Sequence, residues 1–381
     1  MSLKQPRSYQ RLAALYLVLT VGLVCCWFPW IKTAQAEDGG VQIVLTSTPP
    51  LEHIRPDRDL ARVTLTALLH GQPLSQGHMQ VQLTAPPRTQ FVATGFPRVE
   101  GSALLALDTA LTDGTWTVQY LFPLRGTYTF DVGITPVPGG PAFQPTRLRQ
   151  TVHISEDPAV VRNAGMLIGG LFLLGGITGI IFARSAAARE KLWGSAIVAL
   201  LICLGGALIP VHGVLADSGH RGTMVEASQG HQVIHGDQGW ELEVQASPIP
   251  ATVGQLVQFV TWLRKDGTMF PGLTDVHIEV VHREEAHTVL GAHLQARQGH
   301  TLQSLQFYDG APHTVNVTVR PVTGEVSDVA PLTATLGLEV VALHPPLAVK
   351  IRMMAILLGV FVVGMAGGFF VPWPFKERAG A

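Results

Sequence analysis

Polar and hydrophobic residues alternate along many short stretches of the chain, which is the pattern of β-strands that bury one face. Turns rich in Gly, Pro and Asp separate these stretches. The stretches are residues 63–68, 79–83, 115–120 and 128–132, and then 242–244, 257–260, 276–280 and 315–319. They predict two all-β, Ig-like sandwich domains, at residues 37–161 and 216–347, within a chain of mixed fold class.

Three longer runs are apolar without alternation, at residues 164–182, 193–215 and 350–371. Each provides about 20 residues, enough to cross ~30 Å of hydrocarbon as an α-helix. Backbone groups in lipid must be paired internally, so a helix is the expected form. The chain is therefore predicted to add three transmembrane α-helices to the two sandwiches.

The N-terminal 36 residues have the pattern of a secretory signal peptide. Basic residues precede an apolar run at 12–30, and Ala34-Gln35-Ala36 offers a small-residue cleavage site. The apolar run is longer than a usual signal core, so an uncleaved anchor helix is the alternative.

Charge decides the expected topology. The loop at residues 183–192 carries three basic residues, which places it in the cytoplasm by the positive-inside rule. Both sandwiches then lie outside the cytoplasm, and the tail at 372–381 lies inside. This predicts a multi-pass protein of the cell (inner) membrane, with the lipid bilayer as its first partner.

Glycines are spaced four residues apart in the first span, at Gly165/Gly169 and Gly175/Gly179, and the third span carries Gly364, Gly367 and Gly368. This spacing allows two helices to approach closely. Contact among the chain's own helices is the favoured interpretation, and docking on a neighbouring protein is the alternative.

The two β segments align with one another. Residues 122–139 read FPLRGTYTFDVGITPVPG and residues 307–324 read FYDGAPHTVNVTVRPVTG, without a gap. Phe, Thr, Val, Pro and Gly recur at matching positions in the two stretches. The alignment predicts an internal duplication, in which a sandwich followed by a helix is used twice.

Composition and motif content argue against several classes of function for this chain: nucleic-acid binding, blue-copper electron transfer and enzyme catalysis. The formal net charge is -1, so no basic excess favours a nucleic-acid partner. All three cysteines lie in apolar runs, which excludes disulfides and a blue-copper site in the outer domains. The chain has no Gly-rich phosphate loop and no GxSxG motif, so we do not expect an enzyme.

Histidine is the one residue type that suggests chemistry, because imidazole is a common metal ligand where thiols are absent. The second β segment holds ten histidines and the first holds four. Strand parity places His277 and Glu279 on the solvent face, and His282 and His287 in the turn that follows. The candidate ligands for copper or zinc are His277, Glu279, His282, His287, Asp309 and His313. Solvated surface histidines on a polar loop are the alternative, since no spacing here is diagnostic.

The outer domains resemble a known class of periplasmic domain in three stretches: the turn at 266–268, the strand at 276–280 and residues 307–313. They resemble YtkA-like and CopC-like periplasmic Ig-type domains in tandem, over about 70 residues in each copy. This resemblance implies a binding domain linked to copper handling. The order of domains and helices is also similar to that of the copper-binding subunit of particulate methane monooxygenase. That subunit begins with a ligand His and carries an HxH motif, which this chain lacks.

Two functions follow as hypotheses. The first is a membrane-anchored periplasmic binding protein that captures copper or another divalent metal and passes it to a membrane or periplasmic protein partner. The second is a structural or assembly subunit of a membrane complex, in which the β domains mediate protein–protein interaction.

Overall fold

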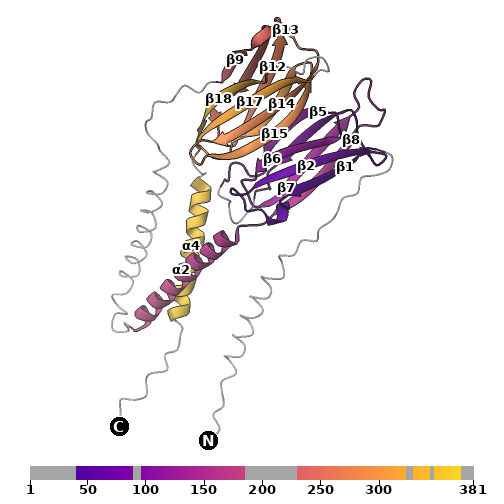
Figure 1. The fold of residues 1–381 in the computed structure, drawn as a ribbon. Coiled ribbons are helices and arrows are strands. Elements are labelled where there is room, and N and C mark those ends of the chain that lie inside the picture. Colours follow the sequence, from indigo (N-terminus) through magenta and orange to yellow (C-terminus); the bar gives the residue numbers. More distant parts are fainter. Residues whose placement is uncertain (1–39, 89–95, 185–229, 323–328, 344–346, 370–381) are drawn as a thin grey trace, which may run out of the picture. The chain divides into compact units, whose positions relative to one another are not determined.

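The computed structural model describes residues 40–88, 96–184, 230–322, 329–343 and 347–369 (Figure 1). The predicted signal peptide, the second predicted span at 193–215 and the C-terminal tail at 372–381 lie outside the described residues. So does the loop predicted at 183–192, apart from its first two residues.

The first half of the chain folds into two β-sheets that face each other. One sheet has the order β1-β2-β6, with β3 paired to β2, and the other has the order β8-β7-β4-β5. The strands are β1 Gln42–Thr48, β2 Leu60–Leu69, β3 Gln72–Pro73, β4 Gly77–Thr84, β5 Ala103–Leu111, β6 Thr115–Leu121, β7 Gly126–Thr135 and β8 Thr146–Ile154; a short 3-10 helix, η1, spans Leu51–His53. Alternate residues of these strands are buried, as the period of two predicts.

The second half repeats this order of pairing. Here β10-β12-β16 matches β1-β2-β6, and β18-β17-β14-β15 matches β8-β7-β4-β5. The elements are β9 His231–His235, η3 Asp237–Gly239, β10 Trp240–Ser247, β11 Ala251–Thr252, β12 Leu256–Lys265, β13 Thr268–Met269, β14 Leu273–His282, β15 His287–Arg297, β16 His300–Gln306, β17 Pro312–Val322 and β18 Leu332–Val341. The prediction of β-sandwich domains is confirmed for the described residues.

Strand register agrees with the sequence alignment of the two halves. Val81 pairs with Val132 across β4 and β7, and Ile278 pairs with Val317 across β14 and β17. Since Val132 and Val317 are aligned residues, the paired residues of β4 and β7 have counterparts in β14 and β17.

The sandwiches join edge to edge through equivalent strands. β6 pairs with β15 and β5 pairs with β16, so each nine-stranded sheet runs through both halves. Tyr120 faces Leu290 in one pairing, and Leu305 faces Leu105 in the other. Tyr120 and Leu305 are counterparts, as are Leu105 and Leu290, so the junction has quasi-twofold symmetry.

Side-chain hydrogen bonds also cross this junction. Ser102 Oγ donates to Gln306 Oε1 at 2.8 Å, and Thr112 Oγ1 donates to Gln295 Oε1 at 2.7 Å. Backbone pairing and side-chain hydrogen bonds from both halves therefore stabilise the junction.

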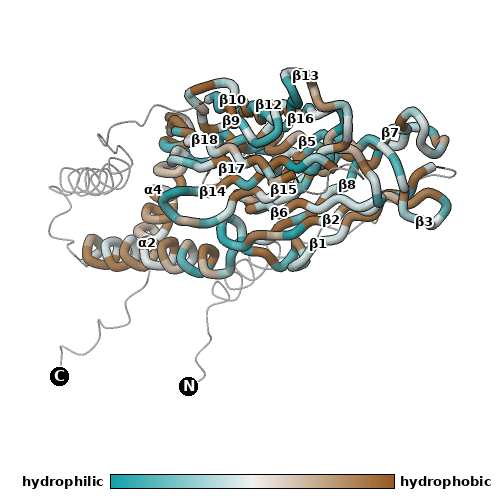
Figure 2. The backbone as a smooth tube through the Cα atoms, turned by 45° about the horizontal axis from the view of Figure 1, so that its top comes forward, coloured by the Kyte–Doolittle hydropathy of each residue, from teal (hydrophilic) through white to brown (hydrophobic). Residues whose placement is uncertain are grey.

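Two described helices are long and apolar enough to cross a membrane, over Pro158–Phe182 and Val349–Phe369. They belong to α2, Pro158–Arg184, and α4, Leu347–Phe369, and hydrophobic residues run along both (Figure 2). The first helix begins six residues before the predicted span at 164–182, because Asp157 accepts the backbone N–H of Ala159 at 2.7 Å and caps it.

Glycines form the contact between α2 and α4. A Cβ atom built at Gly175 would overlap Phe361 O, one at Gly179 would overlap Met365 O, and one at Gly364 would overlap Phe172 O. Close backbone approach of this kind requires residues without a side chain. The favoured interpretation, contact within the chain, is confirmed for these positions.

Gly299, in the turn between β15 and β16, supports a testable prediction for the fold. It has φ of 60°, and a Cβ there would lie 2.6 Å from Leu263 O. We expect Gly299→Ala to destabilise the fold by about 2–4 kcal/mol, because strain and steric overlap add. Gly267 also has positive φ but has no atom within 4 Å of a Cβ, so Gly267→Ala should cost only about 1–2 kcal/mol. Thermal unfolding of the detergent-solubilised chain measures both, and equal shifts would contradict the packing argument.

Candidate metal centre

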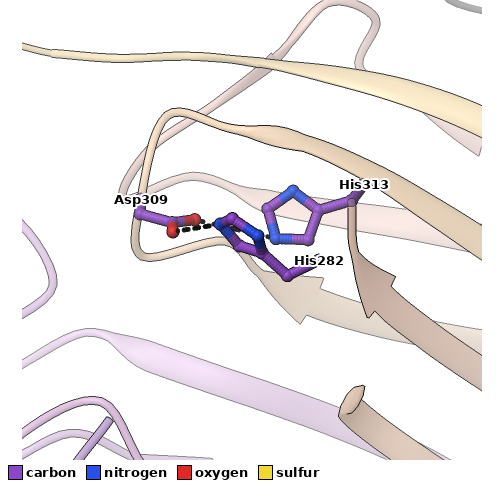
Figure 3. A group of neighbouring side chains, drawn as sticks. All are labelled: His282, Asp309 and His313. Atoms are coloured by element: carbon purple, nitrogen blue, oxygen red, sulfur yellow. Dashed lines mark hydrogen bonds and ion pairs between the residues drawn. The ribbon is translucent and has the colours of Figure 1, made fainter. Parts of the chain in front are cut away.

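Strand pairing brings two of the predicted ligands together. His282 is the last residue of β14, His313 is the second residue of β17, and the two are direct partners in the β14–β17 register. His282 therefore ends a strand and does not lie in the turn predicted from sequence; likewise, His287 begins β15. The loop before β17 places Asp309 against both imidazole rings (Figure 3).

Hydrogen bonding fixes the tautomer of His282. Its Nδ1 accepts the backbone N–H of Glu285 at 3.1 Å, so the ring proton lies on Nε2. That Nε2 is 2.9 Å from Asp309 Oδ2 and donates to it. The hydrogen bond from the β14–β15 turn therefore keeps the proton of His282 on Nε2, which donates to the Asp309 carboxylate.

His313 has the opposite tautomer. Its Nδ1 lies 2.8 Å from Ala311 O, and because a carbonyl only accepts, Nδ1 carries the proton. The Nε2 lone pair then faces Asp309 Oδ1 at 3.6 Å. Burial lowers the pKa of His313 to about 4, so the ring is neutral at neutral pH.

Asp309 Oδ1 has no hydrogen-bond partner among the described residues, although it is buried. A carboxylate oxygen and a neutral imidazole lone pair therefore face each other with no proton between them. Both groups are electron donors, so the arrangement suits a cation.

The ligand atoms are spaced for a metal ion. One atom each from His282, Asp309 and His313 lie within 4.8 Å of one another. Tetrahedral zinc with bonds of 2.0–2.1 Å separates its ligands by about 3.4 Å, so small side-chain movements would close the site. His313 is ready to bind through Nε2. His282 would have to move its proton to Nδ1, which requires release of the Glu285 N–H.

His287 borders this group without joining it. Its ring stacks on His282 with centroids 5.3 Å apart, and its Nδ1 lies 3.2 Å from Glu285 Oε2. Its Nε2 is buried and has no hydrogen-bond partner in the described part of the chain. It remains available as a further ligand or proton acceptor.

The structure places His277 and Glu279 on the solvent face of β14, as strand parity predicts, and away from the other candidates. His277 stacks on His293 across β15 at 4.3 Å between centroids, and burial, with a smaller contribution from His293, lowers the pKa of His277. Glu279 lies 3.4 Å from Thr288 Oγ1. His282 has the parity of the buried Val280, a sequence signal that could have assigned it to the inward face.

In the first sandwich, the positions equivalent to His282, Asp309 and His313 hold residues that cannot act as metal ligands of this kind. The counterparts of His282, Asp309 and His313 are Ala85, Leu124 and Tyr128, and all three are buried. Tyr128 Oη donates to Leu124 O at 2.6 Å and accepts Leu124 N–H at 2.8 Å. The fold therefore does not require ionisable residues here.

No family model matches the chain, and no curated protein matches it. The resemblance to YtkA-like and CopC-like domains therefore remains a prediction. Among solved structures, a conjugative transposon lipoprotein from Bacteroides eggerthii is 17% identical, with a TM-score of 0.17, covering 24% of this chain and 92% of that one. The Yersinia pseudotuberculosis adhesin InvE is 9% identical, with a TM-score of 0.19, covering 80% and 61%.

A segment of two fibronectin type-III domains from chicken tenascin is 7% identical, with a TM-score of 0.16, covering 78% of this chain and 99% of that one. At these TM-scores the similarities assign no function. The described residues are thus defined by their own features: two joined Ig-like β-sandwiches, two apolar helices and one His–Asp–His group.

Proposed function

We propose that this chain is a membrane-anchored binding protein whose second sandwich takes a divalent transition-metal ion, Cu(II) or Zn(II), at His282, Asp309 and His313. The observation that carries the proposal is the buried, neutral His313 whose Nε2 faces an unpartnered oxygen of Asp309. An unsatisfied buried polar group costs about 1–3 kcal/mol. A bound cation would satisfy both groups at once.

Comparison of the two sandwiches supports this function. A scaffold that needed only stability would retain the apolar and tyrosine side chains of the first sandwich at these positions. The second sandwich instead holds two imidazoles and a carboxylate, the ligand types that Zn(II) and Cu(II) take in proteins.

Capture and release follow from the tautomers. An arriving ion would meet the His313 lone pair first and would then bind Nε2 of His282, whose ring proton would move to Nδ1. The second step breaks the hydrogen bond from Glu285 N–H to His282 Nδ1. The turn after β14 therefore limits the affinity for the ion and allows its handover to a protein partner. Two apolar helices would hold this centre at a membrane surface.

Metal titration of the full chain in detergent tests the proposal. We expect one Zn(II) or Cu(II) ion per chain, with affinity reduced at least about 100-fold in the double variant His282→Ala plus His313→Ala. Calorimetry at fixed pH measures this. The proposal fails if wild type and double variant bind equally.

A structural or assembly role is the second candidate, and one observation favours it. Gly165 and Gly169 of α2 have no described atom within 4 Å of a built Cβ, in contrast to Gly175 and Gly179. This pair is suited to the close approach of another helix, and the second role assigns that helix to another protein. A partner that co-purifies in mild detergent and is lost with Gly169→Leu would support that role.

A further inference from the structure

We propose that the outer edge of β1 in the first sandwich pairs with β1 of a second copy of this chain, so that the sheet continues from one copy into the next. This inference does not depend on the metal centre. It assigns an occupant to a strand edge that no described strand covers.

The two sandwiches differ at this edge. β1 ends its sheet and pairs only with β2 among the described residues (Figure 1). Its counterpart β10 pairs with β12 and, on its other side, with β9 through five residue pairs. The side chain of Gln232 in β9 also accepts the backbone N–H of Thr335 in β18 at 2.7 Å, which ties β9 to the opposite sheet. The described part of the first sandwich has no strand equivalent to β9.

Burial of the core shows the consequence of this difference. The register of β1 with β2 and of β10 with β12 makes Leu45 the counterpart of Val244. Val244, which β9 covers, is 0% exposed, whereas Leu45 packs against the core and is only partly buried. Ile234 of β9 supplies an apolar side chain to the core beside Leu242. A strand added to β1 with an apolar residue on its inner face would bury Leu45 in the same way.

The segment of this chain that corresponds to β9 belongs to the predicted signal peptide. β9 lies 9 to 13 residues before Val244, and the same spacing before Leu45 gives residues 32–36, which lie outside the described residues. Cleavage after Ala36 would remove them. Five residues, 37–41, then precede β1, whereas β9 and its turn occupy nine, 231–239. A strand on this edge of the processed chain therefore has to come from another chain.

β1 has none of the features that protect an exposed sheet edge. It reads QIVLTST, without charge or proline, and it pairs with β2 without a bulge. Exposed edges in natural sheets usually carry Lys, Pro or a bulge. The edge strand β8 of the other sheet, by contrast, carries Arg147, Arg149 and His153. The uncharged edge of β1 is suited to strand addition.

The sequence of β1 favours a second copy as the occupant. Residues 42–46 read polar, apolar, apolar, apolar, polar, an order that is the same in both directions. An antiparallel pair centred on Val44 would place Ile43 opposite the second copy's Leu45 on the core face. It would contain five residue pairs, as many as join β9 to β10, and no like charges would face each other.

Sedimentation of the detergent-solubilised chain, with its N-terminus determined by mass, tests this assignment. We expect wild type to be a dimer. Val44→Lys and Val44→Glu should each lose the dimer, because like charges then face each other at the centre of the pair. A mixture of the two variants should form the dimer again, since Lys then faces Glu. The matched control is Thr151→Lys, which adds the same charge to the edge strand β8 and should remain dimeric.

A monomeric wild type would overturn the inference, and so would a dimer that both Val44 variants retain. Gly169→Leu separates strand pairing from association through α2. It should leave the dimer intact, and a dimer that is lost with Gly169→Leu and kept with Val44→Lys would assign the contact to the helix. A monomer that co-purifies with a different protein, and loses it in Val44→Lys, would give the edge to that protein and overturn the assignment to a second copy.

Discussion

Replacing the metal centre with the residues of the first sandwich, by His282→Ala, Asp309→Leu and His313→Tyr, should abolish metal binding and preserve the fold. The first sandwich already packs Ala85, Leu124 and Tyr128 at these positions. A buried polar group exchanged for well-packed residues of suitable shape is often neutral or stabilising.

Thermal unfolding with and without Zn(II) measures both effects. Zn(II) at a hundred times its Kd should stabilise wild type by about 2.7 kcal/mol and leave the triple variant unchanged. His313→Ala alone serves as the control, because it leaves Ala311 O without its donor and opens a cavity. It should lose binding and also unfold at a lower temperature. A triple variant that still gains stability from Zn(II) would contradict the site.

We expect the substitution Gly179→Leu to separate α2 from α4. A side chain there meets the Met365 carbonyl of α4, which is backbone and cannot turn aside. We expect a loss of about 1–3 kcal/mol from the helix pair. The SDS concentration at which the helices unfold, followed by circular dichroism, measures it.

Gly170→Leu is the matched control, because no described atom lies within 4 Å of a Cβ at Gly170. It should change the midpoint much less. Equal effects of the two substitutions would show that α2 and α4 are not held together through Gly179.

Local patterning explains why the strands could be predicted. The alternation along β4, β7, β14 and β17 reflects burial of one face, which is a property of neighbouring residues. The same parity places His277 and Glu279 on the outer face. It would also have placed His282 inward had the strand been continued by two residues beyond Val280.

The junction between the two sandwiches could not be found in this way. There β5 pairs with β16 and β6 with β15, strands that lie in different halves of the chain. Strand pairing between domains depends on which edges remain open after each sandwich has formed. The tautomers of His282 and His313 likewise depend on the backbone positions of Glu285 and Ala311, which composition and spacing do not specify.

Zinc K-edge X-ray absorption of the Zn(II)-loaded chain tests the central claim most directly. The account predicts two imidazole nitrogens and at least one carboxylate oxygen at about 2.0–2.1 Å, with the imidazole signal lost in the triple variant. A zinc shell of oxygen alone, or one that is the same in wild type and triple variant, would contradict it.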